Sequence, residues 1–163
     1  MFDIYVDVNV NTFLVRDDLP LAATHEVRDR CLCLHLQRAA RVVARLFDDA
    51  LRPFGLTNGQ FSLLMAINRP KPPRISDLVP LLAMDRTTLT AALKPLQRRG
   101  LVQIVADSED RRNRRLQLTD DGIDVVRDAL PVWRSTHDEL DQLLPDGDPD
   151  RLRETLSALA HER

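Results

Sequence analysis

Cys31, Cys33 and His35 are the first residues whose types and spacing suggest chemistry, since thiols and imidazoles bind metals. They lie in a stretch with a helical apolar pattern, where residues four apart share a face. Cys31 and His35 would then be neighbours, but two ligands make an incomplete site and the other histidines are scattered. We therefore expect no metal, and interpret both cysteines first as small buried hydrophobic side chains. Two cysteines make no disulfide framework, which favours a reducing cytoplasm.

The sequence lacks the motifs that are typical of enzymes. It has no glycine-rich phosphate loop, nucleophile elbow or paired-histidine metal helix, and its five glycines mark turns and helix ends. We expect neither an enzyme nor a cofactor. No apolar run approaches the length of about 18 residues that spans a bilayer, so no membrane partner is expected. The chain also begins with Asp3 and Asp7 and no basic residue before Arg16, which is unlike a secretion signal.

Charge is distributed unevenly along the chain. The stretch from Arg86 to Arg115 holds eight Lys or Arg against three Asp or Glu, hence a net charge of +5 in a chain whose total is −2. An acidic body with one basic segment indicates a surface that binds a polyanion. A solvated charged surface is the alternative interpretation, and the charge alone does not separate the two.

Apolar periodicity and capping residues predict a mainly α-helical chain with one small β-hairpin. Helices are expected at about residues 24–52, 57–69, 75–82, 86–99, 119–144 and 149–160, with N-caps at Thr24, Thr57, Asp85, Thr119 and Asp148. Strands are expected at 101–105 and 114–118, on either side of a charged turn. Pro95 and Pro131 fall inside two of the helices and should bend them. Residues 1–22 alternate apolar and polar side chains, and form either a strand that pairs with a second subunit or a disordered extension.

The helix pair 75–82 and 86–99, joined by a short turn, fits a helix-turn-helix, and the basic hairpin after it is a wing. With these elements in this order, the chain resembles the MarR family of bacterial transcription regulators over about residues 25–160. The matching segments are Gly55-Leu56-Thr57 with Gln60-Phe61-Ser62-Leu63-Leu64, Met84 to Thr90, Arg98 to Val102, and Asp107 to Arg112 followed by Leu116 to Gly122.

The resemblance implies a winged helix-turn-helix at 55–118 that binds double-stranded DNA. The helix that follows Asp85 would enter the major groove, where Arg can pair with guanine and a Thr methyl group can contact thymine. The wing would place Arg112 in the minor groove, while Arg111 and Arg114 contact phosphates. Asp110 would fold back on a nearby Arg and fix the wing. The expected DNA-contacting residues are Arg86, Thr87, Thr88, Thr90, Ala91, Lys94, Arg111, Arg112 and Arg114.

Family members are homodimers, and the resemblance implies a helical dimerisation region at 23–54 and 119–163, outside an N-terminal extension at 1–22. The dimer would bind a pseudo-palindromic operator. Many relatives bind a small aromatic or anionic effector that releases the DNA, and a protein of this kind acts as a repressor. The residues expected to line an effector pocket are His35, Arg38, Phe61, Met65 and Trp133.

Two further functions remain open. Cys33 stands at a position similar to that of the sensing cysteine in the organic-hydroperoxide-responsive branch of the family, which implies a redox-sensing repressor. That branch surrounds its cysteine with tyrosines, whereas this chain has Tyr5 alone. The second alternative is a winged-helix module that binds protein and not DNA. The basic residues on both the helix and the wing favour DNA.

Overall fold

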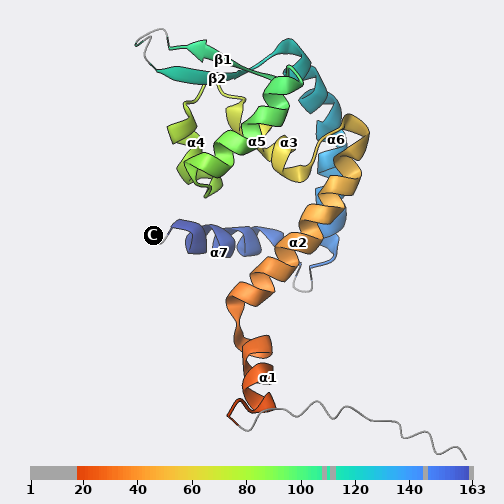
Figure 1. Ribbon diagram of the computed structural model, residues 1–163. Helices are drawn as coiled ribbons and strands as arrows, with labels where there is room; N and C mark the ends of the chain where they lie inside the picture. Colours follow the sequence, from red (N-terminus) through yellow and green to blue (C-terminus); the bar gives the residue numbers. More distant parts are fainter. Residues whose placement is uncertain (1–17, 108–109, 111–112, 145–146, 162–163) are drawn as a thin grey trace, which may run out of the picture. The chain divides into compact units, whose positions relative to one another are not determined.

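The structure is a computed structural model that describes residues 18–107, 110, 113–144 and 147–161. The chain divides into two compact units, Met1–Arg41 and Val42–Arg163. Its elements are helical except for one two-stranded antiparallel sheet, which confirms the predicted mainly α-helical fold with a small β wing (Figure 1). Residues 1–17 lie outside the described part of the chain, so the alternatives for the N-terminal extension stay open. None of the described helices is long and apolar enough to span a membrane.

The first unit contains helix α1 (Leu21–Arg30) and the beginning of helix α2 (Leu32–Leu51). A single helix beginning at Thr24 was expected here, and that prediction is wrong in two respects. The helix begins directly after Pro20, so Thr24 lies inside it. It also breaks at Cys31, whose ψ of 98° is outside the helical range. Neither Gly nor Pro stands at the break, so the sequence carries none of the usual signals of a helix end there.

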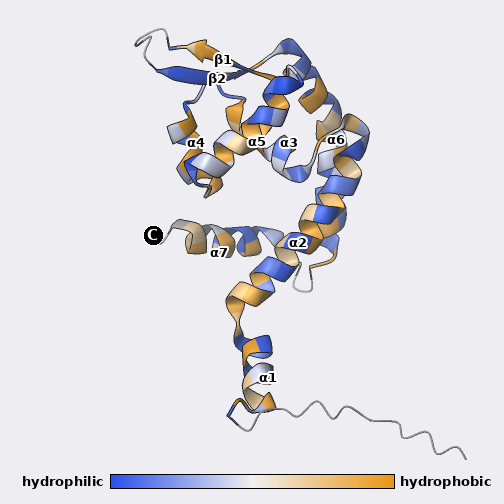
Figure 2. Cartoon of the chain, in the orientation of Figure 1, coloured by the Kyte–Doolittle hydropathy of each residue, from blue (hydrophilic) through white to orange (hydrophobic). Residues whose placement is uncertain are grey.

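The second unit holds the hydrophobic core. Short helix η1 (Arg52–Phe54) follows α2, and helices α3 (Asn58–Ile67), α4 (Ile75–Leu82) and α5 (Arg86–Arg98) come next. Figure 2 shows apolar and polar residues alternating along α5, as expected for a helix with one face on a core. The fully buried side chains of this core include Leu51, Leu64, Leu78, Leu89 and Leu96.

The predicted N-caps of the second unit form as expected. The Thr57 hydroxyl accepts from the Gln60 backbone N–H, while the Gln60 side chain accepts from the Thr57 N–H, which completes a capping box. Thr119 caps helix α6 (Asp120–Gln142), and the Asp148 carboxylate accepts from Arg151 at the start of helix α7 (Pro149–His161). Helices α5 and α6 each run through their internal proline as one element.

Strands β1 (Val102–Ala106) and β2 (Arg114–Leu118) form the wing, with Val102 opposite Leu118 and Ala106 opposite Arg114. The Leu116 N–H also donates to the Pro73 carbonyl at 2.8 Å, which attaches the wing to the segment before α4. At the other end, the Thr119 hydroxyl donates to the Gly100 carbonyl at 2.6 Å and holds the start of α6 against the start of β1. The wing is therefore anchored to the helix-turn-helix on both sides.

The apolar stripes of the C-terminal helices are only partly covered. In α6, Val126 is buried, but Ile123 is 45% exposed, and Leu143, directly after the helix, is 75% exposed. The apolar spacing of this segment predicts that both are buried, and that prediction is wrong for the single chain. In α7, the three leucines of the stripe, Leu152, Leu156 and Leu159, are all exposed. These apolar side chains therefore remain accessible to solvent in the single chain.

Candidate nucleic-acid interface

The N-terminus of α5 is fixed by Asp85. Its carboxylate accepts from the Thr88 backbone N–H at 2.8 Å and from the Thr88 hydroxyl at 2.6 Å. The hydrogen bond from the Thr88 hydroxyl, with the backbone N–H bonds of the first turn, lowers the pKa of Asp85 below its usual value. The cap is therefore ionised at neutral pH, and its contribution to stability falls away only as the pH drops through that lowered pKa.

One face of α5 is free of the core. Leu89, Leu93 and Leu96 are buried, and between them the helix presents exposed side chains to solvent. All six residues of this helix that were predicted to contact DNA are exposed: Arg86, Thr87, Thr88, Thr90, Ala91 and Lys94. The structure thus brings the predicted donors together on one helix with its N-terminus held by a cap.

The three threonines of this face differ in what their hydroxyls do. The Thr88 hydroxyl is used by the Asp85 cap, and the Thr90 hydroxyl donates to the Arg86 carbonyl at 2.7 Å. The Thr87 hydroxyl makes no hydrogen bond within the described part of the chain. Thr87 can therefore offer a hydroxyl to a base or a phosphate, whereas Thr88 and Thr90 offer chiefly their methyl groups.

Not every basic residue of the charged stretch faces outward. The Arg99 guanidinium donates to the carbonyls of Gly55 and Phe54, and so attaches the end of α5 to the segment after α2. Gly55 has a φ of 64°, and a Cβ there would lie 3.2 Å from Arg99 Nη2. Arg115 is directed into a buried ion pair. The net charge of the stretch therefore overstates the charge that is available to a ligand.

The wing tip lies mostly outside the described residues. Arg111 and Arg112, the predicted phosphate and minor-groove contacts, are not described, while Arg114 is exposed at the start of β2. Asp110 was expected to fold back on a nearby Arg. Among the described residues Asp110 contacts Asn113, whose Nδ2 donates to Asp110 Oδ2 at 3.2 Å and whose N–H donates to the Asp110 carbonyl at 2.8 Å. A turn between the two strands is stabilised in this way. The contact with an Arg stays a prediction, because Arg111 and Arg112 lie outside the described residues.

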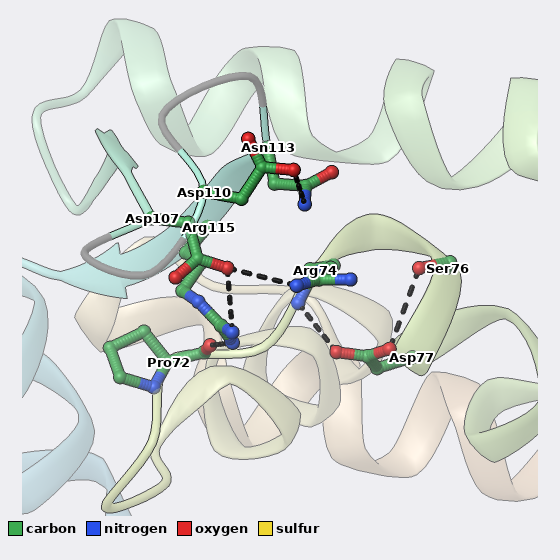
Figure 3. Close-up of polar contacts among 8 residues, drawn as sticks. All are labelled: Pro72, Arg74, Ser76, Asp77, Asp107, Asp110, Asn113 and Arg115. Atoms are coloured by element: carbon green, nitrogen blue, oxygen red, sulfur yellow. Dashed lines mark hydrogen bonds and ion pairs between the residues drawn. The ribbon is translucent and has the colours of Figure 1, made fainter.

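A buried ion-pair network at the base of the wing was missed by sequence reasoning (Figure 3). Asp107 is 1% exposed, and its Oδ2 lies 2.7 Å from Arg115 Nη2 and 3.0 Å from Arg74 Nη2. Arg115 also donates from Nη1 to the Pro72 carbonyl at 2.7 Å. The network joins the end of β1, the start of β2 and the segment before α4. It ties the root of the wing to the segment before α4.

Three of the five predicted effector-pocket residues line one cavity. Phe61, Met65 and Trp133 stand around a volume of about 440 Å³, with Leu81, Leu82, Leu130 and Arg69 among the other wall residues. Phe61 and Trp133 are stacked with ring centroids 5.9 Å apart, and Trp133 also packs on His137 at 4.0 Å. The wall is apolar except for Ser62 and Arg69.

The other two predicted pocket residues, His35 and Arg38, do not line this cavity. They belong to the first unit, where both are exposed. His35 Nε2 lies 3.4 Å from the Asp29 carbonyl of the same unit. The role of both residues in effector binding stays a prediction.

The cysteines are more accessible than expected. Cys33 is exposed and Cys31 is half-buried, so the interpretation of both as buried hydrophobic side chains is wrong for the single chain. The side-chain amide of Gln37 donates to Cys33 Sγ at 3.2 Å. Among the described residues, no group of three or more His, Cys, Asp or Glu side chains is placed to hold a metal ion.

The redox role of Cys33 stays a prediction with a direct test. An accessible thiolate is oxidised by peroxide to a sulfenic acid. If Cys33 is a sensor, Cys33→Ser should make DNA binding insensitive to peroxide, while Cys31→Ser should leave the response as it is. The measurement is the affinity for an operator duplex before and after peroxide treatment. An oxidant response that persists in Cys33→Ser would rule out this role.

The capped, exposed helix α5 and the hairpin that follows it define the class of this protein, a winged helix-turn-helix. The sequence model of the MarR family matches residues 56–113. The M. tuberculosis transcriptional regulator MosR, in a structure in complex with DNA, is 37% identical with a TM-score of 0.72, over 80% of this chain and 94% of that one. The chain belongs to the MarR family of transcription regulators.

Two other proteins that are similar to this chain are also transcriptional regulators. The HTH-type transcriptional regulator SarZ of Staphylococcus haemolyticus is 33% identical over 94 residues, which is 58% of this chain. That match spans 64% of the length of SarZ, which is less than two thirds. The transcriptional repressor CouR, in a structure bound to a 23-mer DNA duplex, is 29% identical with a TM-score of 0.74, over 83% of this chain and 96% of that one. These relatives are transcriptional regulators and not enzymes.

Proposed function

We propose that this protein is a sequence-specific, DNA-binding repressor that acts as a homodimer and is released from its operator by a small-molecule effector. The observation that carries the proposal is the exposed face of α5, where Arg86, Thr87 and Lys94 stand free of the core behind the Asp85 cap. MosR and CouR, which are similar over most of their length, have structures with DNA.

The exposed face of α5 suits the major groove. Arg86 can donate two hydrogen bonds to the O6 and N7 atoms of a guanine, and the methyl groups of Thr88, Thr90 and Ala91 can contact the methyl group of thymine. Lys94 lies about two turns after Arg86 and suits a contact with a phosphate. Base contacts of this kind specify the sequence, whereas phosphate contacts position the protein on the duplex.

The wing supplies the second contact region in this proposal. Arg112 enters the minor groove, where a narrow groove concentrates negative potential, and Arg111 and Arg114 bind the adjacent phosphates. The buried network around Asp107 supports this role because it holds the root of the wing in a fixed place. The wing therefore meets the duplex without paying the full entropy cost of ordering a free loop.

Exposed leucines on the N- and C-terminal helices support the homodimer. Isolated apolar side chains on a surface are ordinary, but a stripe on each of several helices marks an interface. A second copy of the chain would cover these stripes and would place two α5 helices on the two halves of a pseudo-palindromic operator. The exposed leucines that form the stripes are Leu21, Leu32, Leu36, Leu46, Leu143, Leu152, Leu156 and Leu159.

The cavity beside Trp133 is the proposed effector site. Its volume and its apolar wall suit an aromatic ring. An effector releases DNA only if it binds the DNA-incompetent arrangement more tightly than the competent one. Fluorescence of Trp133, the single tryptophan of the chain, offers a direct signal for an aromatic acid in this cavity.

The proposal predicts the effect of Arg86→Ala. Loss of a two-point contact to guanine should weaken binding to the operator by about 1–3 kcal/mol and relax specificity at one base pair. Arg112→Ala should weaken binding by a similar amount if it makes a specific minor-groove contact. The measurement is fluorescence anisotropy with a labelled duplex from the DNA upstream of the coding sequence.

The matched control is Arg127→Ala, which removes the same charge from an exposed site on α6 where Arg127 pairs with Asp124. It should bind the operator as the wild type does. Equal losses in Arg86→Ala and Arg127→Ala would mean that overall charge, and not a base contact, drives binding. Unchanged affinity in Arg86→Ala would remove α5 from the interface and favour a protein-binding module.

A further inference from the structure

A second cavity, which shares Arg69 with the cavity beside Trp133, lies at the root of the wing. It has a volume of about 320 Å³ and is lined by Arg69, Lys71, Pro73, Arg74, Asp77 and Arg115. These residues come from the segment before α4, the first turn of α4 and strand β2. Four of the six carry a positive charge, and two of these, Arg74 and Arg115, also pair with the buried Asp107.

Two carboxylates of the described residues lie at or beside this cavity. Asp77 accepts from the Arg74 backbone N–H at 2.8 Å, and Asp107 accepts from both Arg74 and Arg115. Among the lining residues and Asp107, all of them described, cations outnumber acids. Both acids also hold cationic residues in place, so they shape the site (Figure 3).

The cationic side chains are held in position. The Arg115 side chain is 9% exposed and is fixed by Asp107 and the Pro72 carbonyl. Arg69 donates from Nε to the Ala66 carbonyl at 3.0 Å, and its two terminal nitrogens have no partner among the described residues. A guanidinium that is anchored through one nitrogen keeps its other donors pre-organised for a ligand, which lowers the entropy cost of binding.

We propose that the wing-root cavity binds a phosphate group, with Arg69 and Arg74 as its principal donors. A phosphate offers acceptor oxygens in several directions at once, and planar guanidinium groups bind it through paired hydrogen bonds. The cavity is large enough to admit a phosphate with an attached sugar or a similar group. The phosphate belongs either to the DNA backbone, an alternative that rests on the proposed function, or to a free small molecule.

The first test uses inorganic phosphate and the full-length protein. Equilibrium dialysis with radiolabelled phosphate, at an ionic strength held constant with chloride, should give saturable binding to the wild type. Arg69→Gln should lose most of this binding, because it removes a charge without touching the Asp107 network. Arg127→Gln, with the same charge change on α6, should keep it. Circular dichroism of each variant confirms that it is folded.

The second test separates the two sources of phosphate. If the DNA backbone is the ligand, Arg69→Gln should weaken binding to operator and scrambled duplexes equally. It should also reduce the slope of log affinity against log salt concentration by about one, the loss of one phosphate contact. If a free molecule is the ligand, Arg69→Gln should lose phosphate binding and keep wild-type affinity for DNA.

The proposal is overturned if the wild type binds no phosphate by dialysis and Arg69→Gln binds DNA as the wild type does. Phosphate binding that is equal in the wild type and Arg69→Gln would also overturn it, because the ion would then lie elsewhere. A wild type that binds phosphate but no DNA would contradict the proposed function while it supports the cavity as a phosphate site.

Discussion

Gly122→Ala is expected to lower the free energy of unfolding by about 3 kcal/mol, at the upper end of the usual cost of overpacking. Gly122 lies in the first turn of α6, and a Cβ added there would lie 2.1 Å from the Leu101 carbonyl oxygen. Because the obstacle is backbone, it cannot rotate away as a side chain would. Relief requires α6 to move away from β1, which breaks the Thr119 contacts with Gly100 and Leu101.

Gly59→Ala is the matched control for this substitution. Gly59 lies in α3, and a Cβ there has no neighbour within 4 Å. The same change should therefore be neutral, or stabilise by roughly 0.5–1 kcal/mol through the higher helix propensity of Ala. Urea denaturation followed by circular dichroism measures both. A midpoint in Gly122→Ala equal to that of Gly59→Ala would contradict the close packing of α6 on the wing.

Asp107→Ala should lower the free energy of unfolding by a similar amount, for an electrostatic reason. It leaves Arg115 buried without its carboxylate partner, and removal of one member of a buried ion pair typically costs about 3–5 kcal/mol. Asp124→Ala removes an exposed carboxylate that pairs with Arg127, and should cost less than about 1 kcal/mol. Urea midpoints of the two variants give the comparison.

A double variant sharpens the test of the Asp107 network. If the loss arises because the Arg115 guanidinium is buried without the Asp107 carboxylate, Arg115→Met in the Asp107→Ala background should recover part of the lost stability. A further loss in the double variant would show that Arg115 contributes through its other contacts, such as that with the Pro72 carbonyl. Asp107→Ala should also weaken DNA binding, because the wing is then free to change its angle.

The parts of the fold that local sequence signals determine were predicted well. Thr57, Asp85 and Thr119 each cap a helix through a side chain that accepts from the third residue on, which is a property of a few neighbouring residues. The exposed and buried faces of α5 follow in the same way from its apolar spacing. These two features account for the helix-turn-helix and for the outward donors of the candidate interface.

The parts that depend on distant contacts were not predictable from the sequence. Asp107 stands in a run of charged residues that was expected to form a turn, yet it is buried and pairs with Arg74, which is 33 residues away. Arg99 was counted with the DNA-facing charge, yet it binds the Gly55 carbonyl across 44 residues. The break at Cys31 likewise has no local signal.

The central claim is that the exposed face of α5 makes this chain a sequence-specific DNA-binding protein. The most direct test is fluorescence anisotropy of the wild type with the DNA upstream of its coding sequence and with a scrambled duplex, at two salt concentrations. The account predicts tighter binding to the native duplex and a steep fall in affinity with salt, as phosphate contacts release counterions. Weak and equal binding to both duplexes, and to every member of a random-duplex selection, would contradict it.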